Sequence, residues 1–232
     1  MYCTKQSKAR HTPNLVSGFT LIELLTVIAV IAVLAGVTFG VSSAIRDSQG
    51  RTRAQAEISA ISQALEQFKA RNGDYPWTSS GYSSNSRGSA IANGEELFQA
   101  LTGWRKFNTD GNVSFDLKSQ SDVPQAGPTP YIDVNRLTYA LESSIELDGI
   151  ISEYNPQIDL SLSAPEGLVF IDPWGNPYIY VYSKSSSSWD NFGFVLYSKG
   201  PDATDIAAGT DGVITDTIRN DSVNADNIYA GE

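Results

Sequence analysis

A long apolar run near the start of the sequence is the feature that most restricts how this chain can fold. Residues 19–41, FTLIELLTVIAVIAVLAGVTFGV, contain a single charged side chain, Glu23. A helix of this length would be roughly 35 Å long at about 1.5 Å per residue, enough to cross the hydrocarbon core of a bilayer. The run therefore predicts a transmembrane helix. The alternatives are a plain anchor or a secretory signal peptide cut after Ser42-Ser43-Ala44, although the run exceeds the usual apolar core of about 7–15 residues.

Charge is distributed unevenly along the 232 residues. The chain has 26 acidic and 16 basic residues, a formal net charge of −10, but residues 1–18 contain Lys5, Lys8 and Arg10 and no acid. The rest of the chain therefore nets −13, from 13 basic and 26 acidic residues. Positive charge before the apolar run predicts a cytoplasmic head, with the body on the other side of the membrane. Because the acidic body offers no electrostatic footprint for nucleic acid, we expect no nucleic-acid partner.

Cysteine, histidine and methionine occur once each, as Cys3, His11 and Met1, and all three lie in the basic head. If the head is removed, the mature chain has no thiol, imidazole or thioether. That loss excludes disulfides, Cys or His metal ligands, and catalysis by a Cys nucleophile or a Ser-His-Asp triad. The remaining carboxylates show no spacing that suggests a paired-carboxylate site. We therefore expect a protein that is not an enzyme.

The helical pattern continues beyond the apolar run, with no proline between Leu15 and Tyr75. Residues 46–76 are amphipathic, and Asn72-Gly73 followed by Pro76 predicts a helix stop. We expect one helix over about residues 20–72, locally destabilised at its glycines, Gly36, Gly40 and Gly50. Its apolar stripe has helical spacings of three and four and consists of Ile58, Ile61, Leu65 and Phe68.

The rest of the chain predicts a small α/β domain over residues 77–232. Residues 77–94 are rich in Ser, Gly and Asn and predict a loop. Helical patterns cover residues 94–107 and 133–147. Three β-branched and aromatic runs predict an antiparallel meander: residues 167–171, 177–183 and 192–198. The expected fold class is α+β, a long N-terminal helix, half transmembrane and half amphipathic, packed on a small antiparallel sheet.

The junction Gly18-Phe19-Thr20-Leu21-Ile22-Glu23 resembles the type III signal of type IV pilins and type II secretion pseudopilins. The resemblance implies that prepilin peptidase cuts after Gly18 and methylates the new N-terminal residue, Phe19. It also implies that Glu23 pairs with the positive N-terminus of a neighbouring subunit during filament assembly. A carboxylate in a bilayer-length helix independently suggests a functional residue. The helix dipole favours a negative charge in the first turn.

Two segments near the other end narrow the resemblance to the major pseudopilins. Residues 172–178, DPWGNPY, resemble their DPWG segment, and residues 197–202, YSKGPD, resemble a second family segment. The resemblance covers residues 8–76 and 167–229 and implies a type IV pilin-like fold. Residues 105–165 have no counterpart and are interpreted as an insertion.

The segment 199–232 contains seven acids and two bases, which predicts either a solvated acidic tail or a loop that folds around a cation. Calcium takes about 6–8 oxygen ligands. The resemblance to major pseudopilins implies a calcium site here. Carried over residue by residue, the ligands would be the Lys199 carbonyl, the carboxylates of Asp202 and Asp226, and Asn227 in place of a second Asp, with Asp205 and Asp211 as further candidates.

The expected function is that of a structural subunit of a periplasmic pseudopilus, a helical homopolymer that drives type II secretion. The expected organisation is a cleaved leader (1–18), an apolar half-helix (19–45), an amphipathic half-helix with its stop (46–76) and a globular domain (77–232). Before assembly the subunit would be a single-pass protein of the bacterial inner membrane. Implied partners are prepilin peptidase, the inner-membrane assembly platform and minor pseudopilins. The alternatives are a surface type IV pilin and a membrane-anchored carbohydrate-binding or hydrolytic module.

Overall fold

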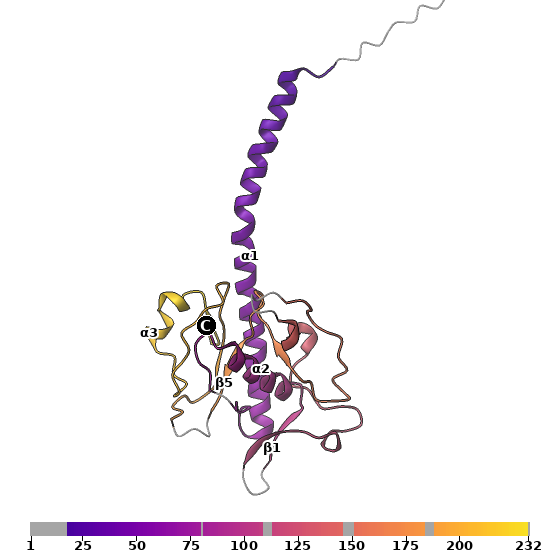
Figure 1. Ribbon diagram of the computed structural model, residues 1–232, viewed down its shortest axis with the longest axis vertical. Helices are drawn as coiled ribbons and strands as arrows, with labels where there is room; N and C mark the ends of the chain where they lie inside the picture. The colour runs from indigo at the N-terminus through magenta and orange to yellow at the C-terminus, as the bar shows by residue number, and fades with distance from the viewer. Residues whose placement is uncertain (1–17, 80, 109–112, 146–150, 184–187, 232) are drawn as a thin grey trace, which may run out of the picture. The chain divides into compact units, whose positions relative to one another are not determined.

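The computed structural model describes residues 18–79, 81–108, 113–145, 151–183 and 188–231, without the side chains of residues 37–45 (Figure 1). The predicted leader, including Cys3 and His11, lies outside the described residues apart from Gly18. The chain divides into two compact units, Met1–Ile45 and Arg46–Glu232. We describe each unit by itself.

One helix, α1, extends over Leu21–Asn72, and the expected helix over about residues 20–72 is confirmed. In the first unit its large apolar side chains from Leu21 to Leu34 are exposed. Within the described part of the chain, no helix reaches the length and hydropathy that a membrane crossing requires. Part of the expected apolar half-helix, residues 37–45 with Gly40, has side chains outside the described set.

The second half of α1 supplies the core of the second unit, and the predicted apolar stripe is confirmed. It packs with α2 (Arg87–Leu101) and with the strands in one cluster of buried side chains, and Figure 1 shows α2 crossing this half of the helix. Phe68 is fully buried and meets three aromatic rings with centroids 5.1–6.1 Å away. The buried apolar positions of α1 follow the helical repeat and are Ala54, Ile58, Ile61, Ala64, Leu65 and Phe68.

Three small antiparallel sheets complete the described part of the second unit. The first pairs β1 (Arg105–Asn108) with β2 (Ser114–Leu117), and the second pairs β3 (Tyr139–Leu141) with β4 (Leu168–Phe170). The third sheet has the order β5-β6-β7, with bounds Ile179–Val181, Val195–Ser198 and Ile228–Tyr229. Short helical turns lie between the strands: Gln120–Asp122, Val134–Arg136, Glu142–Ser144, α3 (Asp216–Arg219) and Ser222–Asn224.

The α+β class with small antiparallel sheets agrees with the expectation, but the predicted helix over residues 133–147 is wrong. Its centre is strand β3, whose Tyr139 pairs with Phe170 of β4, and a 3-10 turn lies on each side. A partner strand 31 positions away in register decides this local structure, because packing against neighbours outweighs the weak intrinsic preference of a short segment.

The helix expected over residues 94–107 is displaced in the sequence. It begins at Arg87, inside the segment predicted as a loop, and its last residue is Leu101. Gly103, with a φ of +87°, turns the chain after the helix, and β1 follows at Arg105. The Ser- and Gly-rich composition of residues 77–94 therefore masked the first turns of α2.

The expected three-stranded meander is confirmed for its second and third strands and wrong for its first. Strand β4 pairs with β3, while β5 pairs with β6 in a different sheet, so β4 and β5 share only an isolated bridge between Ile171 and Pro177. Proline has no backbone N–H to continue a ladder. Pro173 and Pro177, on either side of the turn, thus separate the two sheets.

Candidate functional site

The start of α1 forms a reciprocal capping box between Thr20 and Glu23. The Thr20 backbone N–H donates to Glu23 Oε2 over 2.8 Å, and the Glu23 N–H donates to Thr20 Oγ1 over 3.3 Å. The Thr20 hydroxyl also donates to Glu23 Oε2 over 2.8 Å. This arrangement satisfies N–H groups that a helix start otherwise leaves without partners. This capping box was not predicted, although the pattern Thr-x-x-Glu before an apolar run is its signature.

The bond expected to be cut precedes this cap. Gly18 and Phe19 lie before the first helical residue and are exposed. A Cβ added at Gly18 would meet nothing within 4 Å. The fold of the described chain therefore does not itself demand glycine at this position, and a requirement for glycine would have to come from a bound enzyme.

In the second half of α1, Gly50 is the position on which the DPWG turn packs. A Cβ built on Gly50 would lie 2.8 Å from Trp174 Cζ2, closer than real Cβ contacts allow. Only glycine lets the indole lie directly on the helix here. Gly50, expected only to destabilise the helix locally, is thus the position at which Trp174 packs on α1 within the second unit.

A second contact joins the same turn region to α1. Tyr178 donates from its hydroxyl to Glu57 Oε2 over 2.7 Å, and Arg53 Nε lies 2.8 Å from Glu57 Oε1. Glu57 is only 5% exposed. Burial is the main cause that raises the pKa of Tyr178, and the nearby Glu57 carboxylate adds to it. The phenol therefore stays protonated and able to donate.

Asp172, the first residue of the DPWG turn, organises the turn from a buried position. Its Oδ1 accepts from the backbone N–H groups of Trp174 and Asn176 over 3.0 and 2.8 Å, and its Oδ2 accepts from the Ser198 hydroxyl over 2.6 Å. The residue is 2% exposed, and burial raises the pKa of its carboxyl to about 6 even though these donors favour the charged form. The turn is thus fixed to β6 through one carboxyl group.

This carboxyl predicts a pH-dependent stability. An unfolded Asp titrates near about 3.9, so between about pH 4 and 6 the native state binds more protons than the unfolded state. The Asp172 contribution to the free energy of unfolding therefore falls as pH rises through this window, by roughly 3 kcal/mol. Urea unfolding of residues 46–232 at pH 4 to 7 measures the effect, with Asp172→Asn as the matched variant. Parallel pH profiles for the two proteins would contradict the prediction.

In the acidic C-terminal segment, Asp205 is the centre of a buried network. Its carboxylate accepts hydrogen bonds from the hydroxyls of Tyr82 (2.9 Å) and Tyr197 and from the Asn85 N–H (3.0 Å), and Lys199 Nζ lies 3.1 Å away. Asp205 is 1% exposed and Lys199 is 8% exposed. Burial, followed by the charge of Asp205, raises the pKa values of both tyrosines. The network fixes the loop after β6 to the loop before α2.

The other residues expected to bind calcium differ in their contacts. Asp202 and Asp226 lie together, with the Asp202 N–H donating to Asp226 Oδ2 over 3.2 Å. Asn227 is 7% exposed, and its buried Oδ1 has no hydrogen-bond partner within the described chain. Asp211 instead accepts from the Val213 N–H through its own side chain, over 3.0 Å. Among the residues that the structure covers, no group of three or more His, Cys, Asp or Glu side chains is arranged to hold a metal ion.

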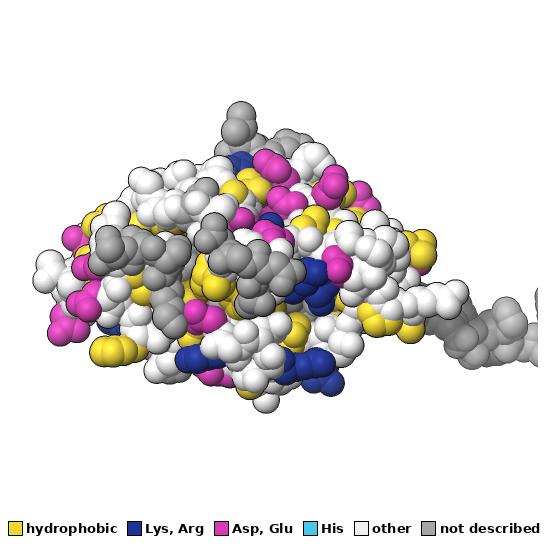
Figure 2. Space-filling model, turned by 90° about the horizontal axis from the view of Figure 1, so that it is seen from below, with side chains coloured by type: hydrophobic (Ala, Val, Ile, Leu, Met, Phe, Trp, Pro, Cys, Tyr) yellow, Lys and Arg dark blue, Asp and Glu magenta, His cyan; other side chains and the backbone are white. Residues whose placement is uncertain are grey.

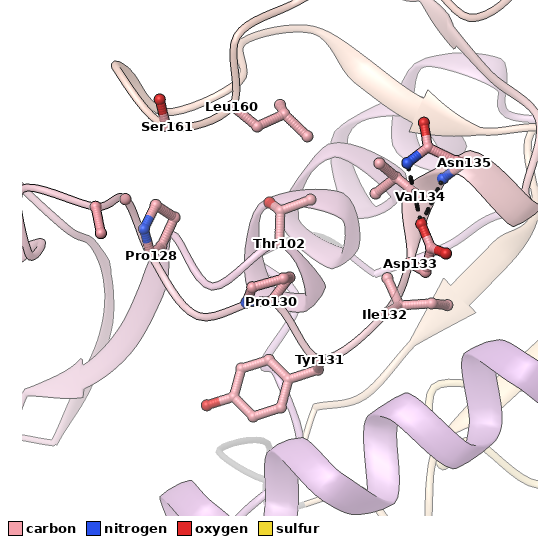
Figure 3. Close-up of a pocket in the computed structure, with 12 residues that line it drawn as sticks. Thr102, Pro128, Pro130, Tyr131, Ile132, Asp133, Val134, Asn135, Leu160 and Ser161 are labelled. Carbon is pink, nitrogen blue, oxygen red and sulfur yellow. Dashed lines mark hydrogen bonds between the residues drawn. The ribbon is translucent and has the colours of Figure 1, made fainter.

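A cavity of about 500 Å³ lies in the part of the chain interpreted as an insertion, with Thr102 also on its wall (Figure 3). Figure 3 shows Asp133 turned toward Asn135, whose backbone N and Nδ2 donate to it over 3.2 and 3.1 Å. The Tyr131 hydroxyl accepts from Asn72 of α1 over 2.9 Å. These polar groups of the cavity wall thus already have hydrogen-bond partners within the second unit.

Comparison with known protein families identifies the class of the N-terminal junction. Residues 14–39 match the family model described as the prokaryotic N-terminal methylation motif. The chain thus carries the processing signal of type IV pilin-like precursors, which prepilin peptidase cleaves and which assemble into filaments. Neither curated proteins nor solved structures gave a match to the chain.

Proposed function

We propose that this chain is the structural subunit of a periplasmic pseudopilus that drives type II protein secretion. The observation that carries the proposal is the methylation motif at residues 14–39, within which the Thr20–Glu23 capping box begins a 52-residue helix. In this proposal the precursor is cut after Gly18, methylated at Phe19 and held in the inner membrane by one span. Its cytoplasmic head is lost and its second unit lies in the periplasm.

The proposed mechanism of assembly is electrostatic and mechanical, and the capping box supports it. Glu23 uses Oε2 to cap its own helix, while Oε1 has no hydrogen bond within the described chain. The second oxygen is therefore free to accept from the methylated amine of a neighbouring Phe19. As subunits leave the membrane, contact between helices replaces contact with lipid, and the carboxylate gains a charged partner.

Two features favour a pseudopilus over a surface pilus. The segment 172–178 resembles the DPWG segment of major pseudopilins, and here it fixes the sheet to α1 through Trp174 and Tyr178. In addition, no cysteine follows Cys3, so the mature chain would lack the disulfide loop common in surface pilins. The surface pilin remains the alternative from the same structural class.

The N-terminal residue and intact mass of the protein from its native membrane test the proposal. We expect a chain that begins at Phe19 and carries one added methyl group. An intact head, or cleavage between Ala44 and Ile45, would contradict processing by prepilin peptidase. Loss of the chain should abolish secretion of exoproteins without removing surface filaments, whereas the opposite result would favour the pilin.

We also propose that calcium binds in the loop between β6 and β7, because Asn227 Oδ1 is buried with no partner beside Asp226. The oxygens of Asp202, Asp226 and Asn227, with the Lys199 carbonyl, suit a hard cation that takes oxygen ligands. Asp205 is not included, since its carboxylate is already held by Lys199 and two tyrosines. The ion would neutralise two carboxylates and supply a partner for the buried amide oxygen.

Thermal unfolding of residues 46–232 with excess calcium and with chelator tests this second proposal. A ligand that binds only the native state adds about 2.7 kcal/mol at one hundred times its dissociation constant, so the midpoint should rise with calcium. Asp202→Ala and Asp226→Ala should remove that rise, whereas Asp216→Ala, an exposed acid of α3, should keep it. A midpoint that millimolar calcium does not move would contradict the site.

A further inference from the structure

The cavity beside Thr102 has an apolar lining that its own chain leaves open to solvent. Apolar groups at half-buried or exposed positions form this lining: Pro128, Pro130, Ile132, Val134 and Leu160. Figure 3 shows Leu160 and Val134 pointing toward one another from two different segments of the chain. A concave surface of this kind is suited to receive an apolar group.

The apolar surface continues outside the cavity in the segment 158–162. Leu160 and Ser161 line the cavity, and Leu162, the next residue, is 67% exposed. Ile158 in the same segment is also exposed. We call the cavity together with Ile158 and Leu162 the insertion cleft. Adjoining apolar groups inside and around a cavity mark an interaction site, whereas single exposed apolar side chains are normal.

The insertion cleft favours an uncharged occupant. Among the described residues that line its cavity there is no lysine or arginine, and the one acid is Asp133. Asp133 accepts hydrogen bonds from Asn135 and lies 3.5 Å from Arg136, so its charge already has a partner. A charged side chain that entered the cavity would lose hydration without gaining a counter-charge.

The same unit holds one aromatic side chain out in solvent. Phe192, on the connection between β5 and β6, is fully exposed at 102%. Its neighbour Asn191 donates from its backbone N–H to the Asp211 carbonyl over 3.2 Å and from Nδ2 to the Gly212 carbonyl over 2.8 Å. The Gly193 N–H donates to Asn191 Oδ1 over 3.0 Å. These bonds fix the backbone on both sides of Phe192, which lowers the cost of ordering it in a contact.

The phenyl ring and the insertion cleft lie on different sides of the second unit. Figure 1 shows β5 and α3 to the left of α1, and the loops of residues 120–162 to its right. Figure 2 shows the hydrophobic side chains of another face as separate groups among polar ones, so that face offers no continuous apolar surface. An apolar cavity of about 150 Å³ already binds benzene, so one of about 500 Å³ has room for a phenyl ring and atoms of its turn.

We propose that Phe192 of one copy of this chain inserts into the insertion cleft of a second copy. The inference rests on the proposed function, since it assigns a contact between neighbouring subunits of the filament. An aromatic side chain in an apolar pocket is a common centre of a protein interface. Because ring and cleft are different surfaces, the contact is heterologous, and heterologous contacts that do not close into a ring extend into open filaments.

A smaller cavity of about 270 Å³ beside Trp189 is the competing receiver. Trp189 and Phe192 belong to the same connection between β5 and β6, so this cavity and the ring are close along the chain. Insertion of each ring into the other copy's cavity would then give a two-fold pair, which closes on itself and cannot extend. A filament contact therefore favours the insertion cleft.

Photo-cross-linking of the full chain in membranes tests the contact. One copy carries a phenylalanine analogue with a diazirine in place of Phe192, and a second copy carries an affinity tag and the natural Phe192. On illumination we expect a tagged dimer, linked within residues 126–135 or 158–162 of the tagged copy. Ala126→Trp in the tagged copy places a large side chain at an exposed position of the cavity wall. It should reduce the dimer about tenfold or more, because the phenyl ring then stays in water.

The control is Val113→Ser in the tagged copy, which removes an exposed apolar side chain outside the insertion cleft and should leave the dimer unchanged. Filaments that depend on Glu23 but give no dimer, or a dimer that Ala126→Trp does not affect, would overturn the inference and leave the proposed function intact. A link to residues 81–82 or 208–212, or to another protein, would also overturn it. The expected dimer without filaments would support the contact and contradict the filament function, and loss of both would overturn both.

Discussion

Glu23→Ala is expected to leave cleavage after Gly18 intact and to stop filament assembly. The substitution removes the carboxylate that the proposed neighbouring amine needs, and would leave that amine without a counter-charge among the packed helices. Repeated at every subunit, this loss prevents a stable polymer. Intact mass of the membrane-bound protein measures cleavage, and electron microscopy of sheared cells or overexpressed filaments measures assembly.

Thr20→Ala separates the role of Glu23 in assembly from its role in the capping box. This variant removes the hydroxyl side of the cap, at about 0.5–2 kcal/mol, and keeps the carboxylate. It should therefore assemble better than Glu23→Ala. Gly18→Leu should block cleavage, and since a side chain at Gly18 meets nothing in the described chain, the block would arise in the peptidase. Abundant functional filaments of Glu23→Ala would contradict the pairing of Glu23 with a neighbour.

Asp205→Ala is expected to lower the free energy of unfolding of residues 46–232 by about 3–5 kcal/mol. The reason is that Lys199 would remain buried without its counter-ion, while Tyr82 and Tyr197 would lose their acceptor. Urea unfolding measures the change. Asp216→Ala, which removes an exposed acid from the same segment, should change the stability by no more than about 0.5 kcal/mol.

A double variant shows whether the unpaired charge causes this loss. Lys199→Met with Asp205→Asn leaves no buried charge and retains an oxygen for the tyrosine hydroxyls, so it should be more stable than Asp205→Ala. The difference should be the same in calcium and in chelator, because Asp205 is outside the proposed ligand set. Equal stability of the two variants would contradict both causes, because the double variant keeps the acceptor and removes the buried charge.

The parts of the fold that the sequence predicted correctly depend on local patterns. The helical repeat of Ile58, Ile61 and Leu65 requires only that one face of α1 be buried, and the structure buries it. The junction from Gly18 to Glu23 was likewise recognisable, because its meaning lies in adjacent residues. Thr20 could have been found in the same way from its spacing to Glu23.

The parts that the sequence did not predict depend on partners far along the chain. Residues 133–147 have a helical pattern but form β3 because β4 pairs with them. Glycine destabilises the interior of a helix, and only the contact with Trp174 explains why position 50 of α1 is Gly50. The burial of Glu57 likewise depends on a distant residue, because Tyr178 donates to its carboxylate from 121 positions away. The local hydrophobic repeat of the sequence cannot show contacts between residues that lie so far apart along the chain.

The contacts between α1 and the later part of the second unit also set the order of events during synthesis. Glu57 meets Tyr178 across 121 positions. At about 5–20 residues per second, roughly 6–24 s separate the synthesis of the helix from that of its partners. During that interval β1 and β2 can already reach Phe68, but Gly50 and Glu57 still lack Trp174 and Tyr178, and the long loop closures make folding slow. The side of the helix that carries Gly50 and Glu57 therefore stays uncovered until the DPWG turn has been synthesised.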